Sequence, residues 1–181
     1  QMVDAVFVSN FVSETALSAL NIVYPLISFI IAVAVMLATG GSAVIAKKMG
    51  EGEHALARQL FSMVVLIGVL FGIAMTLVGI FFTRPLIHLM GSTPALDPYC
   101  YDYLYTLMLF SPFAVLQLLF QTFFITAGKP HLGLVVTVLA GIANIFFDFL
   151  FIVVIPLGVK GAAYGTAIGY CIPAIFGLIF F

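Results

Sequence analysis

The chain has 181 residues, of which 64% are hydrophobic and only 7% are charged, and its formal net charge at pH 7 is −1. Average soluble domains carry about 25% charged residues, so this composition excludes an ordinary water-soluble domain and predicts a chain solvated by lipid. The near-neutral charge, without a basic cluster, also argues against a nucleic-acid-binding surface, and no nucleic-acid partner is expected.

Glycine, proline and charged residues divide the chain into six apolar segments. The expected helices run roughly over 1–12, 14–49, 54–83, 99–127, 131–155 and 160–181. A bilayer core needs about 20 apolar helical residues, so the first segment is too short to cross and resembles the second half of a longer helix. The sequence therefore predicts an all-α membrane helix bundle with five full spans and one truncated span.

The breaks between these segments follow the usual turn chemistry. A Gly-Glu-Gly-Glu stretch at 50–53 separates the second and third helices, and Arg84-Pro85 ends the apolar part of the third. Glycine and proline mark 91–98 as a loop, and they also mark 128–130 and 156–158 as helix ends.

Proline and glycine inside the predicted helices affect their shape and packing. Pro25, Pro112 and Pro173 each lack a backbone N–H, so each frees the carbonyl four residues earlier, which for Pro112 belongs to Met108. Two stripes of small residues are expected to permit close helix contact. These stripes are Gly161, Gly165 and Gly169 in the last segment, and Gly68 with Gly72 in the third.

Basic residues are distributed unequally between the two sets of loops. One side carries Lys47, Lys48, Arg58 and Lys129, and the other carries only Arg84 and Lys160. The positive-inside rule places the richer side in the cytoplasm. The first helix then runs outward, its original amino terminus is cytoplasmic, and the expected location is a bacterial inner membrane.

Two acids, Asp4 and Asp148, fall inside the predicted spans. An ionisable group at mid-bilayer costs roughly 2.5–3.5 kcal/mol on insertion scales, so such groups usually have a functional role. The other five acids lie in or near predicted loops, where solvated charge is the simpler interpretation. They are Glu14, Glu51, Glu53, Asp97 and Asp102.

Asp148 belongs to a polar stripe on the fifth predicted helix. Thr137, Gly141, Asn144 and Asp148 fall at offsets of 0, 4, 7 and 11, which place them on one face. The other faces carry valine, leucine, isoleucine and phenylalanine. We therefore expect the polar stripe to face protein or water.

The helical rise brings three helices to a common depth. Asp4 and Asp148 lie about 12 Å below the outer ends of their helices, and Thr166 lies about 8 Å below the start of its own. Their oxygens, with that of Asn144, could hold a hard cation such as Na⁺, and the paired carboxyls could bind a proton instead. A hydrogen-bond network that only joins helices would explain Asn144 or Thr166 alone.

Gln117 and Gln121 share one face of the fourth predicted helix. With Thr137 and Gly141 of the fifth, they are candidates to line a substrate cavity, and a helix–helix hydrogen bond explains the two glutamines equally well. Catalytic chemistry has little support, because the three histidines fall at helix ends without zinc-type spacing and no phosphate-binding loop occurs. We therefore expect no enzyme activity.

Several stretches, in this order and spacing, resemble the amino-terminal lobe of bacterial multidrug and toxic compound extrusion (MATE) transporters. The likeness covers essentially the whole chain. The stretches are VDAVFV at 3–8, ETALSA at 14–19, GGSA at 40–43, KKMGEG at 47–52, AGKP at 127–130, Asn144 with Asp148, and PLGVKGAA at 156–163.

The resemblance implies a twelve-helix protein of two six-helix lobes, of which residues 1–181 would be the first and the carboxy-terminal lobe is absent. It implies antiport by alternating access, in which organic, often cationic, drug-like compounds leave in exchange for H⁺ or Na⁺, with no other cofactor. The family's amino-lobe cation site corresponds to Asp4, Asn144, Asp148 and Thr166, with the carbonyl of Ala162 as a further ligand. The lipid bilayer and the second lobe would be the partners.

Two rival hypotheses remain open. A lipid-linked-sugar flippase of the same superfamily would need Arg or Lys in its cavity to bind a pyrophosphate, and none falls within the predicted spans. A membrane subunit that binds a partner without transporting anything would show no cation-dependent change in stability. A membrane enzyme is the remaining and weakest alternative.

Overall fold

The computed structural model describes residues 2–181, and within that range the chain is helical without any strand. The helices are α1 (Met2–Phe11), α2 (Glu14–Gly50), α3 (His54–Leu89), α4 (Asp97–Leu109), α5 (Ser111–Thr126), α6 (Pro130–Asp148), the π-helix η1 (Phe149–Val154) and α7 (Val159–Phe180). Four are long and apolar enough to cross a membrane, or five if the bent pair α4 and α5 counts as one span. The all-α membrane bundle predicted from the sequence is confirmed.

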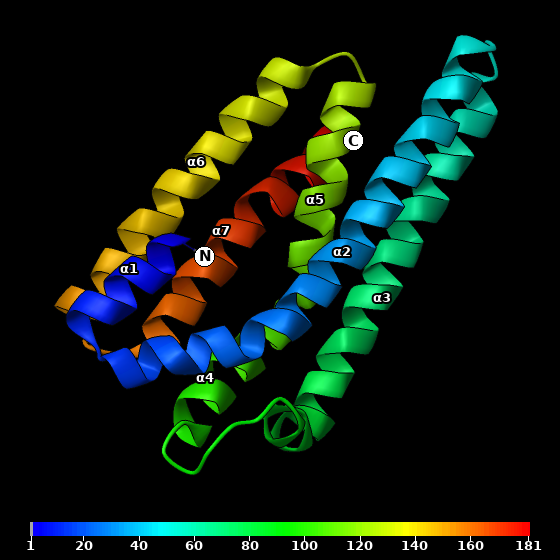
Figure 1. Ribbon diagram of the computed structural model, residues 1–181. Helices are drawn as coiled ribbons and strands as arrows, with labels where there is room; N and C mark the ends of the chain where they lie inside the picture. The colour runs from blue at the N-terminus through cyan, green and yellow to red at the C-terminus, as the bar shows by residue number, and fades with distance from the viewer. Residues whose placement is uncertain (1) are drawn as a thin grey trace.

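Helices α2 and α3 form a long hairpin along one side of the molecule (Figure 1). They have 37 and 36 residues, which correspond to about 55 Å each, well beyond an apolar core of about 30 Å. Ser13 begins α2 by accepting a hydrogen bond from the Ala16 N–H at 3.1 Å. Gly52 closes the hairpin at φ +82°, a conformation that favours glycine.

Helix α3 extends further than the sequence indicated. The predicted helix stopped at Thr83, before Arg84-Pro85, whereas α3 continues to Leu89. Pro85 removes only its own hydrogen bond, and the backbone beyond it remains helical, so that the Met90 N–H donates to the Leu86 carbonyl at 3.0 Å. Gly91, at φ +92°, then ends the helix.

The fourth predicted span is broken in the middle. The sequence indicated one helix over 99–127, but α4 and α5 meet at Phe110 with a bend of 56°. Pro112 is the physical reason, because it cannot donate a hydrogen bond to the Met108 carbonyl. That carbonyl instead accepts the Thr76 hydroxyl of α3 at 2.8 Å, so the carbonyl predicted to be free is satisfied by a neighbouring helix.

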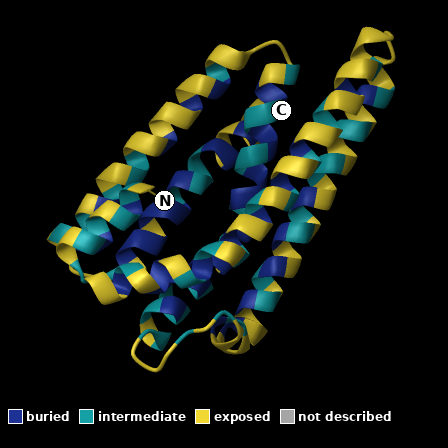
Figure 2. Cartoon of the chain, viewed as in Figure 1, coloured by how far each residue is buried: buried dark blue, intermediate teal, exposed yellow. Residues whose placement is uncertain are grey.

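The buried residues lie on the helix faces that pack inside the bundle. Figure 2 shows buried residues concentrated on α7 and on the inner faces, while α6 and the α2–α3 hairpin present many exposed ones. Many exposed side chains are large and apolar, including Phe81 (70% exposed) and Ile142 (58%), as expected for faces in contact with lipid or another membrane-embedded helix. The chain is a multi-pass membrane protein.

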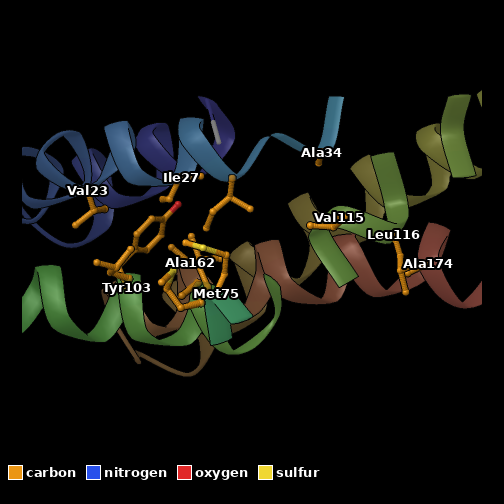
Figure 3. Packing of buried hydrophobic residues seen from close by; sticks show 14 of the residues in the cluster. Val23, Ile27, Ala34, Met75, Tyr103, Val115, Leu116, Ala162 and Ala174 are labelled. Atoms are coloured by element: carbon orange, nitrogen blue, oxygen red, sulfur yellow. The ribbon is translucent and has the colours of Figure 1, made fainter. Parts of the chain in front are cut away.

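The buried core lies where α2, α4, α5 and α7 meet. In Figure 3 the ring of Tyr103 rises from α4 toward α2, whose Val23 and Ile27 belong to the same buried cluster. Ala162 and Ala174 of α7 are also members. Small side chains on α7 allow it to run through the centre of this core, and α1 packs against α2, α6, η1 and α7.

Candidate functional site

Asp4 on α1 is completely buried and is held by two hydroxyl groups. Its Oδ2 accepts a hydrogen bond from the Tyr103 hydroxyl of α4 at 3.1 Å and a second from the Thr166 hydroxyl of α7. The Asn144 side-chain amide of α6 donates to the same Thr166 oxygen at 3.5 Å. Four helices thus meet at a single carboxyl group.

Asp148 is the last residue of α6 and is also completely buried. Its carboxyl lies near enough to that of Asp4 for the two to interact electrostatically. The two carboxyls are close enough to share a proton in a hydrogen bond with each other. When both are ionised, neither oxygen of Asp148 has a hydrogen-bond partner, and the Oδ1 of Asp4 also lacks one. We call Asp4 and Asp148 the acid pair; three of its four oxygens remain available to a ligand.

Buried polar atoms without partners are rare in proteins because each loses its hydration and gains nothing in return. Three such oxygens in one cluster therefore fit a bound cation or protons, either of which would compensate the buried charge. Within residues 2–181 no three His, Cys, Asp or Glu side chains come together as metal ligands. The set here is two carboxyls, a hydroxyl and an amide, which are oxygen ligands suited to a hard cation such as Na⁺.

The backbone of α6 changes at the site. Immediately after Asp148 the α-helix widens into η1, where the Ile155 N–H donates to the Leu150 carbonyl five residues earlier at 2.8 Å. Short π-helical stretches often occur at functional sites, where they redirect side chains. The sequence analysis did not identify this change, because the apolar run Phe149–Val154 is compatible with either helix type.

The glycine stripe of α7, which was predicted to permit close helix contact, faces α6 and η1. A Cβ at Gly161 would lie 2.5 Å from the Phe151 carbonyl oxygen, and one at Gly169 would lie 3.4 Å from the Asn144 Cβ. Gly165, between them, faces Asp148. The close approach of α7 to α6 therefore places Gly165 against Asp148, next to the Thr166 that donates to Asp4.

The structure places the residues predicted to bind a cation in two groups. Asp4, Asn144, Asp148 and Thr166 lie together, as described above. Ala162 lies one turn before Thr166 on α7 and is completely buried. In the described chain, Thr166 forms a hydrogen bond to the acid pair, whereas Ala162 forms none to either acid.

A pocket of about 240 Å³ opens beside this cluster. Its lining contains all four predicted cavity residues together with two of the cluster: Gln117, Gln121, Thr137, Gly141, Asn144 and Thr166. Gln121 donates its amide to the Thr137 hydroxyl at 2.8 Å, so this glutamine also joins α5 to α6. We call this space the polar pocket; Asn144 and Thr166 belong both to it and to the cluster around Asp4.

Tyr103 is the contact that the sequence analysis missed. It is completely buried, yet its hydroxyl needs a hydrogen-bond partner, and Asp4 provides one. A tyrosine within an apolar span is a signal that could have been used. The three histidines give no such signal, since His54 and His131 are exposed and His88 pairs with Asp97 at 3.7 Å near a helix end.

The chain is similar to known proteins over most of its length. The family model described as MatE matches residues 1–150. Multidrug export protein MepA of Staphylococcus saprophyticus is 26% identical over 165 residues, which are 91% of this chain and 37% of that protein. MepA of Staphylococcus haemolyticus is 25% identical over 165 residues, or 91% of this chain and 36% of the relative.

Solved structures give the same result. The MATE multidrug transporter DinF-BH, solved in a ligand complex, superposes with a TM-score of 0.93 at 25% identity, over 99% of this chain and 40% of that one. A MATE structure in the bent conformation superposes with a TM-score of 0.92 at 23% identity, with the same coverage, and shows the shared fold. The chain therefore spans about two fifths of the length of the proteins it matches.

Proposed function

Because the chain belongs to the MatE family, we propose that it forms the amino-terminal lobe of a secondary active multidrug efflux transporter. In this proposal, organic and often cationic compounds leave the cell in exchange for H⁺ or Na⁺, by alternating access. A second lobe of similar size would complete the translocation path. The observation that carries the proposal is the buried acid pair with three oxygens that lack partners, next to a polar pocket.

The acid pair would bind the coupling ion. Asp4 and Asp148 would supply the charge, while Thr166 and Asn144 would complete an oxygen shell. Tyr103 would hold the Asp4 carboxyl in place through its 3.1 Å hydrogen bond. Protons would use the same carboxyls, because adding one proton to two adjacent carboxyls relieves their repulsion.

The polar pocket would contact the exported compound. Its volume of about 240 Å³ is below the roughly 300–1,000 Å³ of most drug-sized sites, so a facing lobe would supply the remaining wall. Among its described lining residues none is Arg or Lys, which fits neutral or cationic compounds better than a pyrophosphate. The matched proteins support this, since two relatives are multidrug export proteins and one solved structure is that of a multidrug transporter.

Shared residues would couple the two ligands. Asn144 and Thr166 contribute both to the polar pocket and to the cluster around Asp4. A cation bound to the acid pair would therefore change the shape and charge of the pocket and favour release of the compound. Such coupling is a free-energy difference between two conformations, and it acts equally in both directions.

Orientation is part of the same proposal. The basic residues near the α2–α3 turn and at Lys129 would face the cytoplasm of a bacterial inner membrane. The first helix would then run outward, and the acid pair would lie in the outer half of the bilayer. Release of the compound to the outside would follow binding of the cation from that side.

Asp148→Asn in the full-length protein tests the proposal directly. Asparagine has nearly the same size but cannot carry the charge, so drug efflux in cells that lack other exporters should fall to the background rate. Asp102→Asn is the matched control, because Asp102 is a partly exposed acid that faces Lys160 at 4.0 Å. Both variants should reach the membrane in normal amounts. Normal efflux by Asp148→Asn would overturn the proposal.

A further inference from the structure

One turn of α7 contacts both members of the acid pair. Thr166 donates its hydroxyl to Asp4, and its neighbour Gly165 packs directly against Asp148. A Cβ added at Gly165 would overlap the Asp148 Oδ1 atom, and it would lie 3.2 Å from the carboxyl carbon. The carboxyl of Asp148 thus occupies the space that any side chain at position 165 would need.

We propose that Gly165 is a positioning residue of the cation site, because its missing side chain determines where the Asp148 carboxyl lies. This inference rests on the function proposed above, in which the acid pair binds the coupling ion. Against the bare backbone of α7, the carboxyl finds no hydrogen-bond donor, and both of its oxygens remain without a partner. Gly165 therefore holds the carboxyl near Asp4 without neutralising it.

Backbone conformation does not require glycine at this position. Positive φ angles occur at Gly52, Gly91, Gly128 and Gly158, and Gly165 is not among them. Alanine would fit the backbone of α7 and has a higher helix propensity than glycine. The space beside Asp148 is what excludes a larger residue.

The three glycines of the α7 stripe differ in what they face. Gly161 faces the backbone of Phe151, and Gly169 faces Asn144 and the Ala140 carbonyl at ordinary contact distances of 3.4–3.5 Å. A methyl group at Gly169 would therefore be accommodated, whereas one at Gly165 would displace a carboxyl oxygen. Gly177, further along α7, provides the matched control, because a Cβ there would overlap the ring of Phe120, away from the acid pair. The same substitution at Gly165 and at Gly177 therefore separates a general packing effect from an effect on the site.

Displacing the carboxyl should weaken the response to the coupling ion. Groups that orient metal ligands typically change metal affinity about 10–100-fold when they are altered. We expect Gly165→Ala to raise the Na⁺ or H⁺ concentration needed for half-maximal effect by about tenfold or more. Gly177→Ala, which overlaps the Phe120 ring instead, should leave that concentration unchanged.

The test uses the full-length protein, with thermal stability in detergent measured over a Na⁺ titration and, separately, over a pH titration. Efflux from proteoliposomes, measured over the same ranges of Na⁺ concentration and of pH, provides the second readout. The expected result is a shift of the half-effective cation concentration for Gly165→Ala and none for Gly177→Ala. Equal behaviour of the two variants would overturn the inference.

A double variant keeps the test decisive if Gly165→Ala does not fold. Asp148→Ala removes the carboxyl and leaves only a 3.1 Å approach of the new Cβ to the backbone nitrogen at position 148. Gly165→Ala in that background should therefore fold, with a much smaller loss of stability than in the parent protein. If the double variant also fails to fold, the clash lies elsewhere and the inference is wrong. Asp148→Ala alone should abolish the cation response; if it does not, the proposed function fails, whatever Gly165 does.

Discussion

Two interfaces in this molecule use glycine to bring helices together, and they differ in what occupies the space. Helix α3 approaches α4 and α5 through Gly68, Gly72 and Gly79, which face Leu119, Pro112 and Met108 respectively. Helix α7 approaches α6 and η1 through its own stripe, which faces Phe151, Asp148 and Asn144. At the first interface most of the space holds apolar atoms. At the second it holds a backbone carbonyl, a carboxyl and an amide side chain.

The difference indicates that one sequence pattern serves two purposes. Small residues four apart allow close approach of helices in lipid, where no hydrophobic effect drives them together. At α3 the close approach lets the helix pack against the kinked span at Pro112. At α7 it gives packing too, but it also excludes water and donors from the Asp148 carboxyl. The residue opposite each glycine, rather than the glycine pattern itself, distinguishes the two interfaces.

Asp4→Asn should give the largest effect and separate the two interfaces most clearly. The amide oxygen can still accept hydrogen bonds from Tyr103 and Thr166, so the fold should be retained, but the charge needed for a cation is lost. We expect drug efflux to fall by about 100-fold or more, in line with an ion site that loses a charged ligand. Transport in proteoliposomes with imposed Na⁺ or pH gradients is the measurement.

Ser92→Ala is a useful control for this variant, because it removes the 2.5 Å hydrogen bond of a loop hydroxyl to Asp97 and leaves the acid pair intact. Efflux by Ser92→Ala should match the parent protein. If Asp4→Asn transports at the parental rate, the α7 interface does not bind the coupling ion, and the distinction between a packing interface and an ion-binding interface is wrong.

Gly72→Ala should have the next largest effect, on stability rather than on coupling. A Cβ there would lie 2.5 Å from the Pro112 Cα and 2.8 Å from its nitrogen, and backbone atoms yield less easily than a flexible side chain. Overpacking of this kind costs about 1–3 kcal/mol, so the thermal midpoint in detergent should fall by several degrees. The cation concentration for half-maximal effect should not move. A shift in that concentration would mean that the α3 interface also controls the ion site.

Composition and breakers were sufficient to predict the membrane class and the helical character of the chain. The stripe of Asn144 and Asp148, with the depths of Asp4 and Thr166, also indicated which side chains could meet, since helical geometry fixes depth. The break at Phe110 was only partly foreseen. Pro112 predicted a freed carbonyl, but neither the size of the bend, 56°, nor the Thr76 hydroxyl that satisfies this carbonyl could be read from the sequence.

Three features of the site were not predicted from the sequence, and each has a physical reason. The π-helix after Asp148 falls in an apolar run, which is compatible with either helix type and carries no signal for it. Tyr103 meets Asp4 across about a hundred residues of sequence, so only the tertiary fold brings them together. Gly165 looked like its neighbours in the stripe, because its distinct role depends on the residue opposite.

Tyr103→Phe should give a smaller effect, confined to the ion-binding interface. Phenylalanine fills nearly the same buried space but removes the 3.1 Å hydrogen bond to Asp4. A net hydrogen bond contributes about 0.5–1.5 kcal/mol, so the half-effective cation concentration should change by up to about tenfold. A cation titration of thermal stability measures this change. Tyr105→Phe is the control, since Tyr105 stacks on Tyr101 at 5.4 Å outside the site, and it should give no shift.

Gly40→Ala should give the smallest effect, because Gly40 belongs to neither of the two glycine interfaces. Gly40 lies inside α2, its φ is not positive, and a Cβ there would meet nothing within 4 Å. A glycine with no close neighbour provides only backbone freedom, and replacing it with alanine should stabilise the helix by about 0.5–1 kcal/mol. The thermal midpoint should therefore rise slightly, with the cation response unchanged. A loss of stability would mean that another membrane-embedded element packs against α2 at Gly40, so that this glycine too is a close-contact residue in the assembled transporter.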